Sequence, residues 1–144
     1  MAWTGSGKTA AFLIPLIEWL KAHSKIVGSW AVILSPTWEL AEQTANNFKL
    51  LSRNTDLRHA LLVGGHEMER EFEVLAWNPD VIIATPGRLA HHMWEAQLLL
   101  STVEVIVYDE ADRMFEMGFM EDIYFITEKM PKHWQSMLFS ATLP

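Results

Sequence analysis

The stretch VIVYDEAD, residues 105–112, decides the fold class of this chain of 144 residues. Its first four residues form a continuous apolar run rich in β-branched side chains, and acids follow at once. Such a run, without polar alternation, is typical of a parallel strand that helices cover on both faces. Similar runs occur along the chain, and we expect strands over residues 31–35, 60–63, 81–84, 103–109 and 136–140.

Helical periodicity separates the apolar runs. Residues 8–22 carry apolar side chains at three- and four-residue spacings, and Pro15 is expected to kink this helix. Thr37 is expected to cap a helix over residues 38–51, and Thr85 one that starts at Pro86 and ends near residue 96. A further helix is expected over 120–130. Strands that alternate with helices predict right-handed crossovers and a three-layer α/β domain with a parallel sheet.

Composition narrows the function classes. Half of the residues are apolar and 20% are charged, which is typical of a globular domain, and no apolar stretch is long enough to span a membrane. The chain has no cysteine, which excludes disulfides and thiolate zinc sites. A formal net charge of −7 argues against a broad basic surface, but it leaves room for a narrow phosphate site built from backbone amides and a few arginines.

The segment AWTGSGKT, residues 2–9, precedes the first expected helix and predicts a phosphate-binding loop. Backbone amides of such a loop, with a helix N-terminus behind them, form a concave anion site. Lys8 would reach the β- and γ-phosphates, and the Thr9 hydroxyl would bind Mg²⁺. The alternative is a flexible glycine turn that only caps the helix. The residues assigned to the nucleotide here are Thr4, Gly5, Ser6, Gly7, Lys8 and Thr9.

Asp109 and Glu110 follow the strand of the opening stretch. Ligands of open α/β sheets bind at the carboxyl ends of the strands, so these acids are candidates for a nucleotide site. Asp109 is the expected Mg²⁺ carboxylate, and Glu110 the expected acceptor of a proton from the attacking water. A solvated acidic turn is the alternative, and the Gly-Lys-Thr loop upstream weighs against it.

Polar loops after the other expected strands should reach the same edge of the sheet. Loop amides, a helix N-terminus and an arginine there can hold a nucleic-acid backbone without reading bases. Ser140 and Thr142 follow the last expected strand and are candidates for sensing the γ-phosphate. Ordinary turn chemistry is the alternative for each loop taken singly. The residues assigned to RNA are Pro36, Thr37, Gly64, Gly65, Thr85, Pro86, Gly87 and Arg88.

Taken together and in this order, these segments resemble the motifs of the DEAD-box RNA helicases. Residues 2–9 resemble motif I, 36–41 motif Ia, and 64–65 the glycine pair of motif Ib. Residues 85–88 resemble the Thr-Pro-Gly-Arg motif, 109–112 motif II in its Asp-Glu-Ala-Asp spelling, and 140–142 motif III. The resemblance implies a RecA-like P-loop NTPase domain over residues 1–144, with a parallel sheet between helices, that binds ATP-Mg²⁺ and one strand of RNA.

The resemblance also implies a larger protein. In this family a second RecA-like domain closes over both ligands, supplies arginines to the γ-phosphate and drives local duplex separation. Residues 113–119 and 78–80 look most like the nucleolar helicases of large-subunit ribosome assembly, which implies an intracellular protein of the nucleus or nucleolus. We also expect a monomer that does not bind a membrane. A phosphate-binding loop needs a strand that leads into it, yet only residues 1–3 precede the loop that starts at residue 4, and no second domain follows. We therefore expect a partial domain that lacks its first strand and is inactive alone.

One departure from the family is chemical. Motif Ia normally has arginine where this chain has Trp38, and an indole cannot replace a guanidinium on a phosphate. Trp3, Trp30, Trp134 and Trp77 also stand where related helicases often carry arginine. We hypothesise that some of these tryptophans reflect a decaying gene copy, a different genetic code or an edited transcript. The alternative is a divergent sequence whose tryptophans pack in the core or stack on bases.

Other features are assigned no function. His91 and His92 are expected at the surface, and Glu67, Glu69, Glu71 and Glu73 are expected to face solvent on a helix with Arg70. Met114, Met117 and Met120, with Phe115 and Phe119, are expected to pack in the core. Two alternatives to the helicase stay open: another P-loop ATPase, and a catalytically inactive fragment that at most binds nucleotide, RNA or a partner protein.

Overall fold

The strands of the sheet lie where the apolar runs predict them. The computed structural model describes the backbone of residues 5–64, 67–131 and 135–138, and side chains within 9–64 and 67–131. Along this part of the chain the elements are α1 (Gly5–Leu20), β1 (Ala31–Leu34), α2 (Trp38–Leu51), β2 (His59–Leu62), α3 (Met68–Ala76), β3 (Val81–Ala84), α4 (Pro86–Glu95), β4 (Val105–Tyr108), α5 (Ala111–Glu116), α6 (Met120–Glu128) and β5 (Gln135–Leu138).

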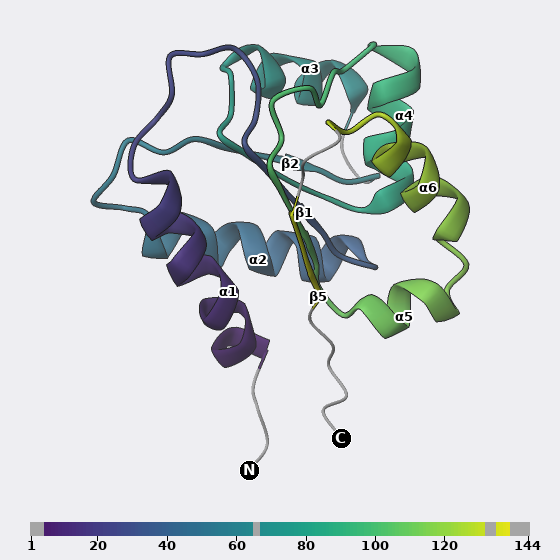
Figure 1. Cartoon of the computed structure of the whole chain (residues 1–144), viewed down its shortest axis with the longest axis horizontal. Helices are drawn as coiled ribbons and strands as arrows, with labels where there is room; N and C mark the ends of the chain where they lie inside the picture. The colour runs from purple at the N-terminus through teal and green to yellow at the C-terminus, as the bar shows by residue number, and fades with distance from the viewer. Residues whose placement is uncertain (1–4, 65–66, 132–134, 139–144) are drawn as a thin grey trace.

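All described strands are parallel, in the order β2-β3-β1-β4-β5 (Figure 1). β1 is central, and its first residue, Ala31, pairs with Val81 of β3 and with Val105 of β4. The crossover from β1 to β2 passes over β3, and the crossover from β3 to β4 passes over β1, whereas β2–β3 and β4–β5 are adjacent pairs. The chain therefore reverses its direction across the sheet after β1, and the loops that follow β1 and β4 diverge there.

Side chains that alternate along the strands build one core on each face of the sheet. Val32 and Leu34 point to the face covered by α4, α5 and α6, whereas Ala31 and Ile33 point to the face covered by α1 and α2. Figure 1 shows these two helical layers on opposite sides of the sheet. Nearly every residue of β1, β2, β3 and β4 is buried, which is why these strands read as unbroken apolar runs. The expected three-layer α/β fold is confirmed.

Helix starts follow local chemistry. The Thr37 side chain accepts a hydrogen bond of 3.3 Å from the Leu40 amide and caps α2. Thr85 is the N-cap residue of α4 and Pro86 follows at the first position, as expected, but the Thr85 side chain makes no capping bond. α1 continues through Pro15, so one helix spans the expected kink. α5 was not predicted from the sequence.

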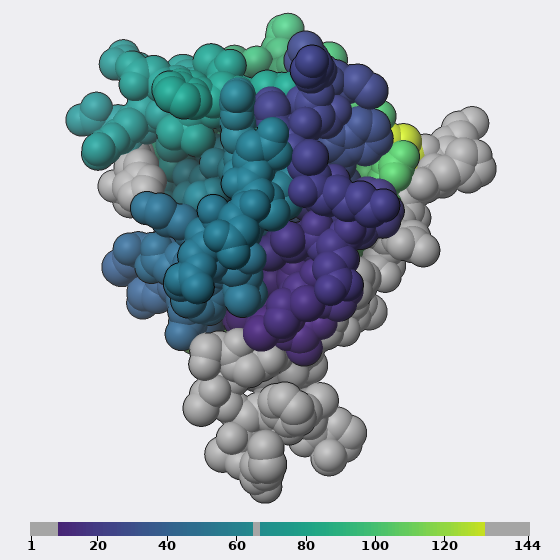
Figure 2. Space-filling view, turned by 90° about the vertical axis from the view of Figure 1, so that its left-hand side faces the viewer, coloured from purple at the N-terminus to yellow at the C-terminus, as the bar shows by residue number. Residues whose placement is uncertain are grey.

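A buried carboxylate ties together the amino-terminal edge of the sheet. Asp80 precedes β3 and accepts hydrogen bonds from His23 Nδ1 (2.8 Å), the Ser24 amide (3.0 Å) and the Arg58 amide (2.9 Å). The His23 amide donates a bond of 2.8 Å to the Asp56 carboxylate, which links the loops before β1 and β2. Figure 2 shows the side of the molecule on which α1 lies, with α1 in purple. The loops before β1, β2 and β3 are thus fixed by one side chain.

No helix of the described residues is long and apolar enough to cross a lipid bilayer.

Candidate functional site

The loops with the candidate residues meet at the carboxyl edge of the sheet, the lower edge in Figure 1. Three backbone bonds extend the sheet there, from Asp109 N to Leu34 O (2.9 Å), Ser35 N to Ala84 O (3.0 Å) and Thr85 N to Leu62 O (3.3 Å). α1 and α5 both begin at this edge. The structure therefore brings the ends of β1, β2, β3 and β4 together with the first turn of α1.

The acidic pair at the end of β4 occupies two different environments. Asp109 is 5% exposed, whereas Glu110 is partly exposed and accepts a bond of 3.3 Å from Arg113 Nη1. Glu110 has φ 55° and ψ 51°, the left-handed backbone conformation that residues other than glycine and asparagine rarely adopt. Backbone strain of this kind clusters at functional sites, because the surrounding structure must maintain it. The turn lets β4 pass directly into α5 and separates the two carboxylates.

The first helix presents its N-terminus to the same edge. α1 begins at Gly5, so residues 5–8 form its first turn. Phe12 and Leu13 are fully buried among the residues of the α1 and α2 face and fix the helix against the sheet. Thr9 is buried one turn before them. Thr4 lies outside the described residues, and so do the side chains of Ser6 and Lys8.

The donor set at this edge fits a magnesium ion bound together with a nucleotide. Mg²⁺ prefers hard oxygen ligands and usually binds through one or two carboxylates plus phosphates and water. Asp109 offers a buried carboxylate and Thr9 a buried hydroxyl. In the described part of the chain, no three His, Cys, Asp or Glu residues gather into a cage that would hold a metal by protein ligands alone. An ion shared with phosphates matches that arrangement.

Ser35 belongs to the same edge and was missed by sequence reasoning. It follows β1 as Asp109 follows β4, and the β1–β4 register pairs the preceding residues, Leu34 and Tyr108. Its side chain is fully buried, and its Oγ has no hydrogen-bond partner among the described residues. A buried hydroxyl without a partner is costly, so it is a candidate for contact with a ligand. A single serine after a strand carries no sequence signal that would identify it.

The loops assigned to RNA differ in exposure. Pro36 is buried and Thr37 is engaged in capping α2, while Trp38 is 53% exposed at the first position of that helix. Gly64 is exposed, and a Cβ added there would meet nothing within 4 Å. Gly87 lies in the first turn of α4, 3.6 Å from Asp122 as measured from the position of an added Cβ. Gly65, Ser140 and Thr142 lie outside the described residues.

Two expectations about polar residues near this edge are wrong. Glu71 does not face solvent: it is buried and accepts hydrogen bonds from Arg88 Nε (2.8 Å), His92 Nε2 (2.6 Å) and the Val63 amide (2.9 Å). His92 is not a surface residue but is fully buried beside Glu71, although His91 is exposed as expected. Arg88, assigned to RNA, thus has its guanidinium oriented by an internal carboxylate.

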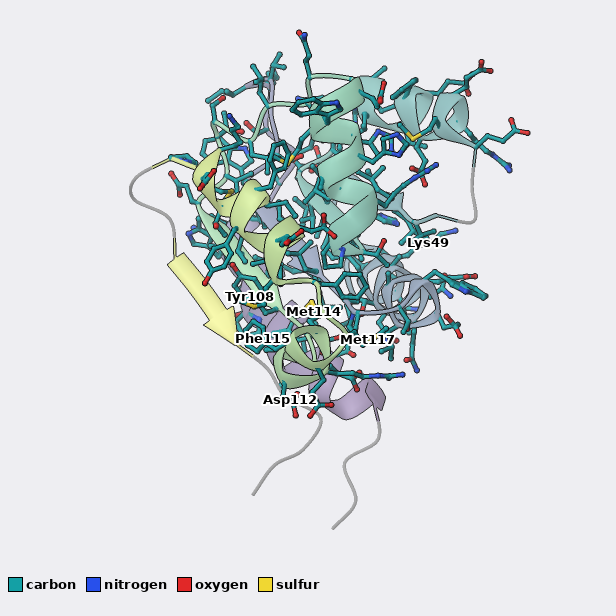
Figure 3. All side chains as sticks on the ribbon, turned by 90° about the vertical axis from the view of Figure 1, so that its right-hand side faces the viewer. Lys49, Tyr108, Asp112, Met114, Phe115 and Met117 are labelled. Carbon is teal, nitrogen blue, oxygen red and sulfur yellow. The ribbon has the colours of Figure 1, made fainter. Side chains whose placement is uncertain are left out.

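The expected core cluster of methionines and phenylalanines is only partly a core. Met114 is fully buried and Phe119 packs against the same core, whereas Phe115 and Met117 are 45% and 48% exposed. Figure 3 shows Met114, Phe115 and Met117 around α5, with Tyr108 and Asp112 nearby. α5 follows Glu110 directly, and it buries Ala111 and Met114.

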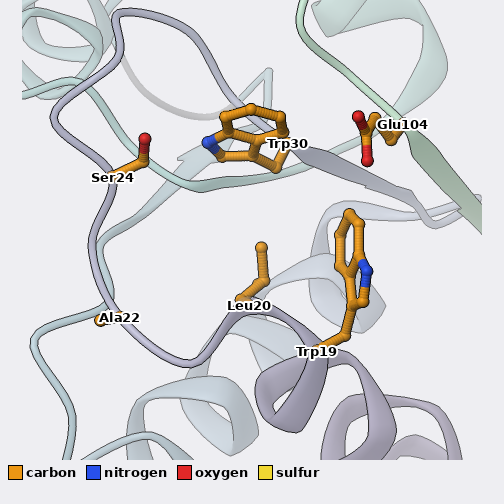
Figure 4. Close-up of a pocket in the computed structure, with 6 residues that line it drawn as sticks. All are labelled: Trp19, Leu20, Ala22, Ser24, Trp30 and Glu104. Carbon is orange, nitrogen blue, oxygen red and sulfur yellow. The ribbon is translucent and has the colours of Figure 1, made fainter.

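The tryptophans of interest lie in three environments. Trp38 and Trp77 are exposed, and Trp30 is partly buried, with no hydrogen-bond partner for its Nε1 in the part of the chain that the structure describes. Trp3 and Trp134 lie outside the described residues. Trp30 also lines a pocket of about 300 Å³ with Trp19 and Glu104 (Figure 4). Because Trp30 and Glu104 precede β1 and β4, this pocket lies at the opposite edge of the sheet from the candidate site.

An open parallel sheet between helices, with a Gly-Ser-Gly-Lys-Thr helix start and an Asp-Glu pair at its carboxyl edge, defines a RecA-like α/β domain. The chain belongs to the DEAD/DEAH box helicase family, whose model matches residues 1–144.

Among curated proteins, it is 56% identical over its whole length to an ATP-dependent RNA helicase DBP10 of Debaryomyces hansenii and covers 16% of that protein. It is 58% identical to the ATP-dependent RNA helicase ddx54 of Dictyostelium discoideum and covers 13% of it. The chain thus spans less than a fifth of either relative.

Solved structures agree with the fold. A crystal structure of a DEAD box protein from the hyperthermophile Methanococcus jannaschii matches the whole chain with a TM-score of 0.87 and 40% identity, over 39% of that protein. The yeast DEAD-box splicing factor Prp28 matches the whole chain with a TM-score of 0.86 and 34% identity, over 36% of that protein.

Proposed function

We propose that this chain forms the first RecA-like domain of an ATP-dependent RNA helicase, which binds ATP-Mg²⁺ and single-stranded RNA along the carboxyl edge of its sheet. The observation that carries the proposal is the convergence of the α1 N-terminus, the Asp109–Glu110 pair and the loops after β1, β2 and β3 on that edge. Family membership and the names of its relatives support the substrate class.

Each residue of the nucleotide site has a distinct role in the proposal. Amides of residues 4–9 hold the phosphates, and the Lys8 ammonium neutralises their charge. Thr9 and Asp109 bind the magnesium ion. When bound, ATP-Mg²⁺ supplies a phosphoryl group whose transfer to water releases the energy for strand separation. Glu110 accepts the proton of that water, and Ser140 and Thr142 couple the γ-phosphate to the RNA side.

The RNA side of the proposal uses phosphate contacts. Exposed Gly64 lets a backbone approach without a Cβ in the way, and the first turn of α4, which follows Thr85 and Pro86, would present the Gly87 and Arg88 amides to an anion. Such contacts position RNA without selecting a sequence. Closure by a second RecA-like domain belongs to the longer protein. We also propose, from the likeness to DBP10 proteins, a nucleolar role in ribosome assembly, which a fluorescent fusion would test by its location.

ATP hydrolysis with and without single-stranded RNA tests the proposal, in this chain and in a version extended in both directions. We expect RNA-stimulated turnover in the extended protein, and its loss on Lys8→Ala or Glu110→Gln. Glu104→Gln is the matched control, because Glu104 precedes the same strand at the opposite edge and is exposed. Stimulation by DNA alone would indicate a different P-loop ATPase. Absence of turnover in both versions would support an inactive fragment.

A further inference from the structure

The carboxylate of Glu71 joins three elements beyond the end of the sheet. Glu71 is 1% exposed, and its Oε2 accepts the Val63 amide at 2.9 Å. Its Oε1 accepts both Arg88 Nε at 2.8 Å and His92 Nε2 at 2.6 Å. Val63 follows β2, Glu71 lies on α3, and Arg88 and His92 lie one turn apart on α4. One side chain therefore connects α3, α4 and the loop after β2.

The same carboxylate lies directly behind two of the loops assigned to RNA. Val63 immediately precedes Gly64, and Arg88 closes the Thr85–Arg88 segment at the start of α4. The backbone bond from Thr85 N to Leu62 O is the last that joins these two strand ends. Beyond that bond, the loop after β2 is linked to α4 through Glu71, which accepts hydrogen bonds from both Val63 and Arg88.

Protonation of the cluster follows from its donors and acceptors. An ionised carboxylate only accepts hydrogen bonds, so the proton of the His92 ring lies on Nε2. Among the described residues, His92 Nδ1 is buried without a hydrogen-bond partner. The cluster thus pairs the Glu71 carboxylate with the Arg88 guanidinium. Charge-assisted hydrogen bonds of this kind are stronger than neutral ones and hold their geometry firmly.

We propose that Glu71 is a positioning residue for RNA binding, which sets the spacing between the glycine loop after β2 and the start of α4 and fixes the direction of the Arg88 side chain. This inference rests on the proposed function and deepens it. Glu71 itself touches no RNA, because it is buried behind the loops that would. Its removal should therefore weaken RNA binding while leaving the nucleotide site, at the ends of β4 and α1, intact.

Asp80 offers a matched control within the same fold. It is also 1% exposed, and it also accepts three hydrogen bonds, from His23, Ser24 and Arg58. Like Glu71, it joins elements by accepting from both side chains and backbone. It lies, however, at the amino-terminal edge of the sheet, away from every loop assigned to RNA. Loss of Asp80 should disturb the fold without moving the RNA loops.

The test measures two affinities in the extended protein, for labelled oligouridylate and for a fluorescent ADP analogue. For Glu71→Met we expect RNA affinity to fall about tenfold, the size of one or two lost phosphate contacts. Nucleotide affinity should stay within about twofold, as for independent sites. Asp80→Leu should leave both affinities within about twofold of the parent. Glu71→Gln retains one acceptor oxygen and should recover part of the RNA affinity.

The outcomes separate this inference from the function on which it rests. A parent protein without RNA affinity refutes the proposed function. A parent that binds RNA, together with a folded Glu71→Met variant that binds equally well, overturns the positioning role alone. Equal losses of RNA affinity in Glu71→Met and Asp80→Leu would also overturn it, since they indicate a general loss of structure. If Glu71→Met does not fold, amide exchange at Val63 and Arg88 in Glu71→Gln decides: parental rates contradict the inference.

Discussion

Replacement of Trp38 by arginine should add a phosphate contact to the RNA side of the site. Trp38 is the first residue of α2, directly after the Thr37 cap, and is 53% exposed at the carboxyl edge of the sheet. An arginine there needs no repacking of the core. A positive charge at a helix N-terminus costs about 0.3–1 kcal/mol. We therefore expect a folded variant whose stability is slightly lower and whose RNA affinity is higher.

The size of the gain depends on salt. A hydrogen bond to a charged group contributes about 1 kcal/mol or more, which corresponds to roughly fivefold in Kd. Each phosphate contact changes the slope of log K against log salt by about 0.7 for a single strand, so a fourfold rise in salt removes roughly 2.6-fold of affinity per contact. Trp38→Arg should thus bind more tightly at low salt and lose its advantage steadily as salt rises.

Fluorescence anisotropy with a labelled single-stranded RNA across a salt series measures both quantities. Trp77→Arg is the control, because Trp77 is 69% exposed and the substitution changes the charge equally. Trp77 follows α3 and precedes β3, at the other edge of the sheet. The reasoning is refuted if Trp38→Arg leaves the salt slope unchanged, or if Trp77→Arg alters it as much, because the effect would then be one of net charge.

Three further predictions concern stability and titration. Pro15→Ala should raise the free energy of unfolding by about 1–3 kcal/mol in urea titrations, because Pro15 lies exposed inside α1 and lacks the amide that a helix interior uses; no gain would mean that α1 is shaped around the proline. Burial alone would raise the pKa of Glu71, but hydrogen bonds from His92, Arg88 and Val63 outweigh it and hold the pKa below the usual 4.5. The stability that Glu71 contributes is therefore present above pH 4.5 and lost as the pH falls through the lower folded value, and this acid decline should be weaker in Glu71→Gln. Burial, and then the charge of Lys49, lower the pKa of His59 below 6.5, so Lys49→Gln should raise that pKa only part of the way in an NMR titration; a full return to 6.5 would contradict the dominant role of burial.

The strands were predictable because burial on both faces leaves a plain sequence signal. Residues 81–84 were placed without error, and β1 and β4 differ from expectation only at their ends. α5 was missed because its six residues are too few to establish a helical period. Its N-cap residue, Glu110, makes no side-chain cap bond, so the usual start signal is absent.

The buried polar cluster shows where composition misleads. Glu71 was grouped with neighbouring acids, yet it lies four residues before Leu75, which packs on the core, and so shares its inward face. His92 lies in the buried stripe with Leu89 and Met93. The helical spacing of Glu71 and His92 was therefore sufficient to predict that both are buried. What the sequence lacks is the pairing between α3 and α4 that makes burial of a carboxylate tolerable.

The candidate site was predictable as far as strand ends determine it. Asp109 and Thr85 were expected at one edge because parallel strands end together, and backbone bonds now place them there. The left-handed backbone of Glu110 and the burial of the Ser35 hydroxyl were not foreseen. Both depend on how the chain turns after a strand, which three or four residues of sequence do not encode on their own.

The left-handed backbone of Glu110 lowers the stability of the fold at a position where the proposed catalysis needs a carboxylate. Glycine would relieve about 1 kcal/mol of backbone strain there, and asparagine part of it. A library of this chain selected only for survival on heating should therefore accumulate glycine or asparagine at position 110. The selected variants would lack the Glu110 carboxylate, which is proposed to accept the proton of the attacking water. Directed evolution of a hardier variant would need turnover as a second, simultaneous criterion.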